Sequence, residues 1–175
     1  PWGRSEIKLN VAGEHMIPNA LAAASVGLAL GLPIESVAEG LSCIDLSPLR
    51  MEIVNCSNGA IVINDTYNAN PTSMKAALDS LSLLPCKGRK VAFLGLMAEL
   101  GEKTSIAHTE VKRHAEELGI EVVAVETELY GEPSIDNLEA VSTELENMRF
   151  GENDALLFKA SRVVGLEKIV KDIIT

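Results

Sequence analysis

Strand-like and helix-like segments alternate along this chain from residue 51 to its end. Short apolar runs take turns with longer stretches whose apolar residues recur every three or four positions. The expected strands are 51–54, 60–63, 91–94, 122–125 and 155–158, and the expected helices are 72–84, 105–118, 135–148 and 162–174. This alternation is typical of a parallel sheet with right-handed crossovers and helices on both faces. Because Ser57-Asn58-Gly59 favours a hairpin, we predict one there and, beyond it, an α/β fold with a mostly parallel sheet.

The first fifty residues follow a different pattern. Residues 7–11 are expected to form a short strand, and an alanine-rich helix is expected over 20–30, ended by Gly31 and Pro33. A second helix is expected over 34–41, and 45–50 has the composition of a linker. One strand and two helices are too little for an independent core. We therefore expect residues 1–50 to belong to another domain, or to pack on the second one.

The composition narrows the class of protein. A hydrophobic content of 47% excludes a disordered chain, and 3% aromatic residues predict a core of Ala, Val, Leu and Ile. A net charge of −10 argues against nucleic acid as a partner, although a small anionic nucleotide needs only a local patch of donors. The three cysteines lack metal-ligand spacing and are expected to be buried thiols in a reducing compartment.

The chain has no visible targeting segment. Its longest apolar run, 20–30, is about half the ~20 residues that a membrane span needs, so a cytoplasmic protein without membrane insertion is expected. The sequence begins at Pro1 rather than at a methionine, which favours a piece of something larger.

A dense polar run occupies residues 64–73, between the expected strand 60–63 and the helix that follows. Polar groups at the carboxyl end of a strand lie where open α/β sheets bind ligands. Asn70-Pro71 suits an N-cap followed by proline at the first helical position. We expect free N–H groups of that helix to point at the turn and to attract an anion.

Two more polar clusters follow expected strands, and parallel strands would bring all three to one sheet edge. Residues 97–102 follow 91–94, with Glu99 and Glu102 expected to be solvated. Lys159, Ser161 and Arg162 follow the last strand; two cations at a helix start oppose the macrodipole and favour an anionic ligand.

Other candidate sites are weaker. His15 and Asn19 precede the alanine-rich helix. His108 and His114 lie six apart on one helix and face different sides, so no metal site is expected there. Neither G-x-x-x-x-G-K-S/T nor G-x-G-x-x-G occurs in these residues.

Five motifs, in this order, resemble one family, the Mur ligases. They are 13–24 (Gly-Glu-His-Met-Ile-Pro-Asn-Ala-Leu-Ala-Ala-Ala), 48–50 (Pro-Leu-Arg), 64–74 (Asn-Asp-Thr-Tyr-Asn-Ala-Asn-Pro-Thr-Ser-Met), 95–101 (Gly-Leu-Met-Ala-Glu-Leu-Gly) and 158–162 (Phe-Lys-Ala-Ser-Arg). The resemblance implies that 1–50 is the tail of a central ATPase domain and 51–175 a Rossmann-like C-terminal domain. It points to the members that join D-alanyl-D-alanine to UDP-N-acetylmuramoyl-tripeptide in peptidoglycan precursor synthesis.

The family reaction, as the resemblance implies it, uses ATP to activate the tripeptide carboxylate as an acyl phosphate, which the dipeptide amine then attacks. ATP and Mg²⁺ would be bound mainly by a part of the enzyme outside these 175 residues, so we expect this chain alone to be inactive. A monomer is expected, and no residue here is expected to hold a metal.

The resemblance also implies roles for single residues. Asn19 would contact the adenine, with His15 near the reaction, Arg50 would reach the terminal phosphate and Asp65 would hold the ribose hydroxyls. The remaining nucleotide contacts would come from Tyr67, Asn68 and Asn70, and the dipeptide site would be lined by Lys159, Ser161 and Arg162. Arg162 could clamp a carboxylate because its guanidinium is a planar, bidentate donor.

Three positions depart from the family pattern: Met16 stands for Asn, Leu96 for Asp and Ala160 for Gly. Ala160 would hinder a positive φ or a close backbone approach. Three alternatives stay open: another amino-acid-adding Mur-type ligase, a stand-alone nucleotide-binding or regulatory α/β module, and an interaction domain.

Overall fold

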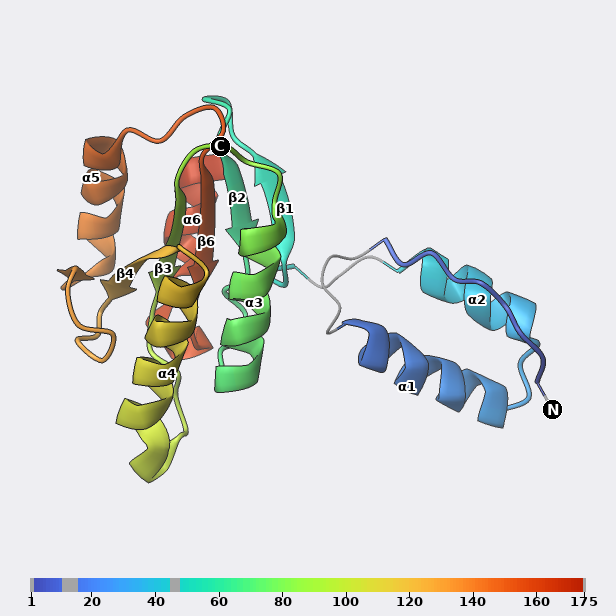
Figure 1. Ribbon diagram of the computed structural model, residues 1–175. Coiled ribbons are helices and arrows are strands. Elements are labelled where there is room, and N and C mark those ends of the chain that lie inside the picture. Colours follow the sequence, from blue (N-terminus) through green and yellow to red (C-terminus); the bar gives the residue numbers. More distant parts are fainter. Residues whose placement is uncertain (1, 11–15, 45–47, 175) are drawn as a thin grey trace. The chain divides into compact units, whose positions relative to one another are not determined.

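The structure of the chain, a computed structural model, describes residues 2–10, 16–44 and 48–174. These residues form two compact units, 1–47 and 48–175, which are described one at a time (Figure 1). No helix within the described ranges is long and apolar enough to cross a membrane.

The first unit consists of two helices, α1 (Met16–Ala29) and α2 (Ile34–Ser42), joined by a turn at Gly31 with φ +85°. Helix α1 begins four residues before the predicted start, because Pro18 lies in its first turn, where a missing N–H costs no helical hydrogen bond. The predicted strand 7–11 is wrong over 7–10, which form no strand, while residue 11 lies outside the described residues. No strand is described in this unit. An extended segment at 7–10 therefore has no neighbouring strand with which to form backbone hydrogen bonds.

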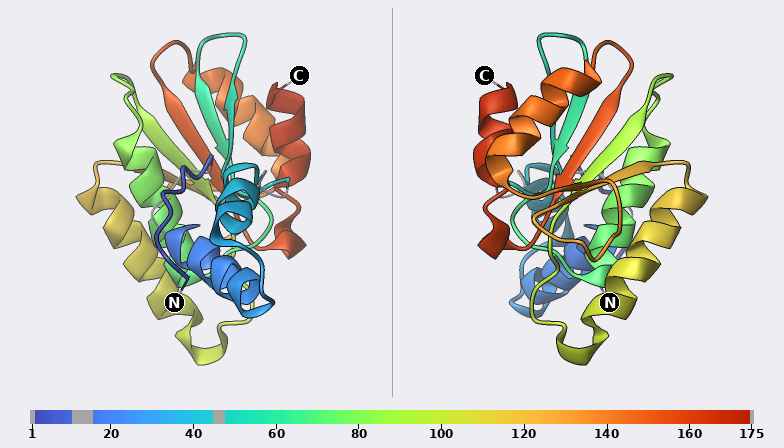
Figure 2. Two further views of the ribbon diagram at one scale, coloured as in Figure 1. Left: turned by 90° about the vertical axis from the view of Figure 1, so that its right-hand side faces the viewer. Right: turned by 90° about the vertical axis from the view of Figure 1, so that its left-hand side faces the viewer.

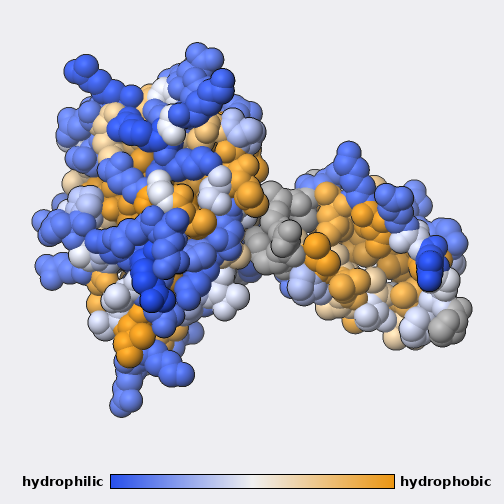
Figure 3. Space-filling view, viewed as in Figure 1, coloured by the Kyte–Doolittle hydropathy of each residue, from blue (hydrophilic) through white to orange (hydrophobic). Residues whose placement is uncertain are grey.

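The core of the first unit is small. Within the described ranges its buried apolar side chains come only from α2, and α1 buries none. Large apolar side chains are exposed instead and give this unit the orange areas of its surface in Figure 3; they include Ile17, Leu21, Val26, Leu30 and Leu32. A surface of this kind is unusual for a protein unit that folds alone.

The second unit is built on one six-stranded sheet of order β1-β2-β6-β3-β4-β5. Its strands are β1 (Glu52–Asn55), β2 (Ile61–Asn64), β3 (Lys90–Leu94), β4 (Glu121–Val125), β5 (Ser134–Ile135) and β6 (Ala155–Lys159). Strand β1 runs antiparallel to β2 through the predicted hairpin, in which Gly59 has φ +86°. The other neighbouring pairs are parallel, so the predicted α/β fold with a mostly parallel sheet is confirmed.

Helices cover both faces of this sheet, with α3 and α4 on one face and α5 and α6 on the other (Figure 2). Their bounds are α3 (Pro71–Leu83), α4 (Thr104–Glu117), α5 (Leu138–Met148) and α6 (Glu167–Ile174). The central strands are buried on both faces, as parallel strands between two helical layers must be. On the α5/α6 face Phe93 stacks on Phe158 with ring centroids 4.9 Å apart, and Phe150 meets Phe93 edge-on.

Two predicted helices were placed differently. Helix α5 begins at Leu138 rather than 135, because 134–135 pairs with β4 as the unpredicted strand β5 and Asn137 caps the helix by accepting the Ala140 N–H. The predicted helix 162–174 is split into a 3₁₀ turn, Arg162–Val164, and α6. Gly165 separates them with φ +74°, a left-handed conformation that ends a helix.

Candidate functional site

A polar cleft lies at the carboxyl ends of β2, β3 and β6, which are neighbours in the sheet. It has a volume of about 710 Å³, and loops from three parts of the chain form its walls. The lining residues are Tyr67, Asn68, Ala69, Asn70, Ala98, Glu99, Leu100, Ser161, Arg162 and Val163. The prediction that three polar clusters meet at one sheet edge is therefore confirmed.

A buried ion pair lies beneath this cleft. The ammonium of Lys159, whose residue is only 2% exposed, is 2.5 Å from Asp65 Oδ2 and donates to the Asn68 carbonyl at 2.8 Å. The other carboxylate oxygen, Oδ1, accepts the Met51 N–H at 3.2 Å. Burial lowers the pKa of Lys159; the Asp65 carboxylate opposes that shift, and Arg50 adds a smaller lowering. The pair joins the end of β6 to the turn after β2.

Arg50 is held over the same turn by a constrained backbone. Its guanidinium lies 4.1 Å from the centre of the Tyr67 ring. The residues on either side, Leu49 and Met51, have φ of 68° and 48°, a left-handed conformation that bulky residues avoid. Two hydrogen bonds hold them there: Tyr67 N–H to the Leu49 carbonyl at 3.1 Å, and Met51 N–H to Asp65. The backbone on either side of the exposed Arg50 is thus fixed to the turn that follows β2.

The start of α3 is capped as predicted, but it is not an open anion site. Asn70 Oδ1 accepts the Ser73 N–H at 2.9 Å, and Ser73 Oγ accepts the Asn70 N–H at 3.1 Å, which forms a capping box. Pro71 has no N–H, and the Met74 N–H already donates to the Asn70 carbonyl. The expectation of several free N–H groups at this helix end is wrong, because Pro71 has none, the cap uses that of Ser73 and the first helical hydrogen bond uses that of Met74.

Ser161 ties two walls of the cleft together. Its hydroxyl accepts the Ala98 N–H at 2.9 Å and donates to the Ala69 carbonyl at 3.4 Å. Its own N–H donates to the Leu96 carbonyl at 2.9 Å. The side chain is buried, so its position is set by the loops rather than by solvent.

Ala160 fits the structure without a left-handed backbone, since its φ is not positive. Its methyl group lies against Gly95: a Cβ built on Gly95 would be 2.7 Å from the Ala160 Cβ. The close approach that Ala160 was expected to hinder is therefore made from the other side, by a glycine at the end of β3.

Arg162 lies at the rim of the cleft. Its side chain is 57% exposed, and one guanidinium nitrogen is 3.6 Å from Glu167 Oε1. The other oxygen of Glu167 is buried without a hydrogen-bond partner. Beside Arg162, the exposed Val163 joins Ala98 and Leu100 in an apolar part of the lining; Ala98 and Leu100 belong to the predicted cluster 97–102, whereas Val163 was not predicted. Glu99 also lines the cleft, and φ of +64° places it at a sharp bend.

Four of the predicted site residues that the structure describes are not among the residues that line the polar cleft: Arg50, Asp65, Lys159 and Asn19. Asn19 is exposed on α1, in the first unit, where its amide contacts the Met16 sulfur at 3.7 Å. His15 lies outside the described residues. In the parts of the chain that the structure describes, no three His, Cys, Asp or Glu side chains gather into a possible metal site.

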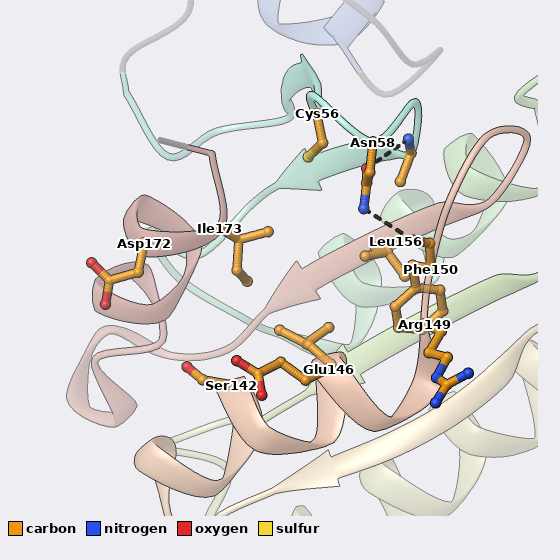
Figure 4. A pocket seen from close by; sticks show the side chains of 11 residues that line it. Cys56, Asn58, Ser142, Glu146, Arg149, Phe150, Leu156, Asp172 and Ile173 are labelled. Carbon is orange, nitrogen blue, oxygen red and sulfur yellow. Dashed lines mark hydrogen bonds between the residues drawn. The ribbon is translucent and has the colours of Figure 1, made fainter.

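A second cavity, the apolar cavity, lies at the amino-terminal ends of β2 and β6. It has a volume of about 480 Å³, and Figure 4 shows side chains from the β1–β2 hairpin, α5, β6 and α6 facing it. The lining comprises Cys56, Asn58, Ala60, Ser142, Leu145, Glu146, Arg149, Phe150, Leu156, Asp172 and Ile173. Asn58 closes one side by donating to the Phe150 carbonyl at 3.0 Å.

The chain was compared with protein families and curated proteins. Residues 49–162 match the family model described as Mur ligase, glutamate ligase domain. A UDP-N-acetylmuramoyl-tripeptide–D-alanyl-D-alanine ligase of Bacillus subtilis is 36% identical over 183 residues, covering 94% of this chain and 39% of that protein. The ligase of the same name from Mycobacterium leprae is 40% identical over 136 residues, covering 70% of this chain and 26% of that protein.

Solved structures give the same result. MurF from Acinetobacter baumannii superimposes with a TM-score of 0.85 at 31% identity, over 99% of this chain and 40% of that one. MurF from Thermotoga maritima in complex with ADP has a TM-score of 0.76 at 26% identity, over 94% of this chain and 39% of that one. The chain thus spans at most about two fifths of the length of these relatives. With a family match over more than half of its residues, a shared sheet and a polar cleft built from the expected motifs, this chain belongs to the Mur ligase family.

Proposed function

We propose that this chain is the C-terminal part of an ATP-dependent ligase that joins D-alanyl-D-alanine to UDP-N-acetylmuramoyl-tripeptide in peptidoglycan precursor synthesis. The observation that carries the proposal is the polar cleft, in which Tyr67, Asn68 and Asn70 face Ser161 and Arg162. These residues come from the motifs that resemble this branch of the family. The names of the Bacillus and Mycobacterium relatives support the same substrates.

The proposed nucleotide side is the turn after β2. Asp65 accepts one hydrogen bond on each carboxylate oxygen, which leaves lone pairs for two ribose hydroxyls. Lys159 favours the ionised form of this carboxylate, which is the better acceptor. Arg50 offers an exposed cation for the terminal phosphate, where fixed positive charge stabilises phosphoryl transfer. For Asn19 and His15 the proposal rests on the family resemblance alone, and for ATP itself it is supported by the ADP complex of the Thermotoga relative.

The proposed dipeptide side is the wall formed by residues 98–100 and 161–163. The guanidinium of Arg162 can bind a carboxylate through two parallel hydrogen bonds. Val163 and Ala98 supply apolar surface for alanine methyl groups. Lys159, which was predicted to line this side, is buried under the cleft, and we propose that it acts through Asp65 and the Asn68 carbonyl.

We further propose that residues 1–50 are the tail of the central ATPase domain and 51–175 the C-terminal domain. The exposed apolar side chains of α1 support this, because a helix of a larger domain would bury them against the rest of that domain. The phosphate-binding loop and the Mg²⁺ ligands would then lie in a part of the enzyme outside these residues. A cytoplasmic location and a monomeric state stay predictions.

The test uses the full-length enzyme that contains this chain. Release of phosphate should require ATP, the UDP-linked tripeptide and D-alanyl-D-alanine together, and mass spectrometry should find the UDP-linked pentapeptide. The 175-residue chain alone should form no product. Product formation by that chain alone, or a full-length enzyme that accepts single amino acids but not the dipeptide, would overturn the proposal.

Two variants separate the two sides of the cleft. Asp65→Asn should raise the KM for ATP about tenfold or more, since it removes a charged acceptor. Arg162→Leu should raise the KM for the dipeptide by a similar factor and leave the KM for ATP nearly unchanged. Arg113→Leu is the matched control, because Arg113 pairs with Glu117 on the exposed side of α4 and does not line the cleft. A stand-alone nucleotide-binding module would instead bind ATP tightly in calorimetry of the 175-residue chain.

A further inference from the structure

His108 is a fully buried histidine on α4 whose two ring nitrogens are both used. Nε2 accepts the Met97 N–H at 3.0 Å, and Nδ1 lies 2.7 Å from the Thr104 carbonyl. Because Met97 N–H can only donate and the Thr104 carbonyl can only accept, Nδ1 carries the proton and Nε2 is bare. The imidazole is therefore neutral and fixed in one tautomer.

Tyr130, in the connection between β4 and β5, packs beside this ring with centroids 4.9 Å apart. Its hydroxyl is buried and donates to the Gly95 carbonyl at 3.1 Å. Burial raises the pKa of this phenol well above its usual value, so it stays a donor at physiological pH. Two buried polar side chains from different elements thus reach the same loop.

That loop, residues 95–100, ends in Ala98, Glu99 and Leu100, which form one wall of the polar cleft. Its outer contacts come from the other wall: Gly95 N–H donates to the Lys159 carbonyl, Leu96 accepts from Ser161, and Ala98 donates to Ser161 Oγ. On the inner side, the Gly95 carbonyl and the Met97 N–H have Tyr130 and His108 as their partners. Without those two side chains, the Gly95 carbonyl and the Met97 N–H would be buried without a hydrogen-bond partner. Because that costs free energy, the loop would shift to find other partners.

We propose that His108 and Tyr130 are positioning residues: they hold the 95–100 loop so that its cleft wall, 98–100, stands at the distance that Ser161 and Arg162 need to receive the incoming substrate. This inference rests on the proposed function of the cleft. Neither residue lines the cleft, so each acts only through the loop backbone. The imidazole must be an acceptor toward Met97, which the neutral Nδ1–H tautomer provides and the imidazolium does not.

A purely structural role would have a different signature. If His108 only fills the core, a leucine of similar volume should serve as well as a glutamine. If it positions the wall, the side chain must offer an acceptor to Met97 N–H, which glutamine Oε1 can do and leucine cannot. His114 on the same helix provides the matched control, because it pairs with Asp79 near the surface and lies outside the cleft lining.

The experiment measures steady-state kinetics of the full-length enzyme for wild type, His108→Leu, His108→Gln, Tyr130→Phe and His114→Leu. We expect His108→Leu to raise the KM for D-alanyl-D-alanine about tenfold, the effect of one lost buried hydrogen bond, with a much smaller change in the KM for ATP. His108→Gln should recover most of this loss, Tyr130→Phe should raise the same KM several-fold, and His114→Leu should leave it unaltered. Equal KM values for the Leu and Gln variants overturn the inference.

A second measurement does not depend on activity. Nitrogen-15 NMR of the histidine side chains should show His108 as the neutral Nδ1–H tautomer, and Met97 N–H should be strongly protected from hydrogen exchange in wild type and in His108→Gln. Its protection should fall in His108→Leu, which keeps the inference testable even if that variant is too unstable for kinetics. An Nε2–H tautomer overturns the inference. Inactivity of the wild-type enzyme with the three substrates would overturn the proposed function and leave this NMR result standing.

Discussion

The two ends of the same strands carry cavities that differ in how their polar groups are held. The polar cleft at the carboxyl ends of β2, β3 and β6 is floored by a buried ion pair and walled by hydrogen-bonded loops. The apolar cavity at the amino ends is floored by side chains such as Cys56, Leu145 and Ile173, with Glu146 and Asp172 exposed at its mouth. Burial there raises the pKa of the Cys56 thiol, which makes it a poorer nucleophile.

The contrast teaches that an apolar lining does not by itself mark a functional site in this fold. Burying Lys159 beside Asp65 costs solvation free energy that a pair of apolar residues would not cost. The polar cleft keeps this pair. The turn beside the pair is further constrained by the left-handed residues on either side of Arg50. The apolar cavity has a hydrogen bond from Asn58 to the Phe150 carbonyl and one left-handed residue, Arg149, but no buried ion pair is described among its lining residues. Sites that keep costly polar groups are the stronger candidates for function.

The largest expected effect is at the ion pair. Lys159→Met should destabilise the 175-residue chain by about 3–5 kcal/mol, because it leaves the Asp65 carboxylate buried without its partner. Urea unfolding followed by circular dichroism measures this. The double change Asp65→Asn with Lys159→Met should recover part of the loss. Lys75→Met, which breaks the exposed pair with Glu110, is the control and should cost less than about 1 kcal/mol. If Lys159→Met lowers the free energy of unfolding no more than Lys75→Met does, the buried pair does not distinguish the polar cleft from the other end of the strands.

The next effect is at the contact between Gly95 and Ala160. Gly95→Ala should cost about 1–3 kcal/mol, since the new methyl would meet the Ala160 Cβ at 2.7 Å in a packed wall. Combining it with Ala160→Gly should restore most of the stability in the same unfolding assay. If the double variant is no more stable than Gly95→Ala, the contact is not what fixes these two residues.

A smaller, pH-dependent effect is expected from His108. Burial lowers the pKa of His108, and its hydrogen bond to the Thr104 carbonyl opposes this more weakly; neither hydrogen-bond partner of the ring is charged. The unfolded chain therefore binds more protons than the folded chain below the ordinary pKa of 6.5. The free energy of unfolding should fall as the pH drops below that value. His108→Gln removes the titrating group, so the difference between wild type and variant should grow in favour of wild type up to about pH 6.5 and then level off. A pH-independent difference would contradict this assignment.

The smallest effect is expected at the apolar cavity. Glu146→Gln, at its mouth, should change stability by less than about 0.5 kcal/mol and leave both KM values of the full-length enzyme unaltered. Asp65→Asn makes the same chemical change in the polar cleft, so the two variants compare like with like. A KM change for Glu146→Gln as large as that for Asp65→Asn would show that both ends of the sheet contribute to ligand binding.

Much of the fold could be predicted from local pattern. The strands of the second unit were predicted to within one residue at each end where apolar runs were buried on both faces, as in β3 and β6. Strand β5 was missed because a strand of two residues is too short to show an alternating pattern. The predicted strand 7–11 is wrong over 7–10 because its unit offers no partner strand among the described residues. Helix breaks at Gly165 and at Asn137 depend on backbone conformation and capping, which apolar spacing does not report.

The site could be predicted as a region but not in its detail. Polar runs after strands correctly located the loops of the cleft. They did not tell that the Lys159 ammonium points under the cleft to Asp65, because a sequence gives the strand end and not the direction of a side chain. His108 was considered only together with His114 as a metal pair, since nothing local connects it with Met97 eleven residues earlier.

The sequence by itself determined the alternation of strands and helices, the hairpin at 55–59, the cap at Asn70 and the family of this protein, because each depends on neighbouring residues or on motif order. The tertiary structure decided which polar groups face the cleft and which form hydrogen bonds within the protein instead. Lys159, Ser161 and His108 find their partners 94, 63 and 11 residues away, so only the folded sheet brings the paired atoms within hydrogen-bonding distance. The direction of a buried polar side chain is set by the partner that satisfies it, and that partner is chosen by the fold.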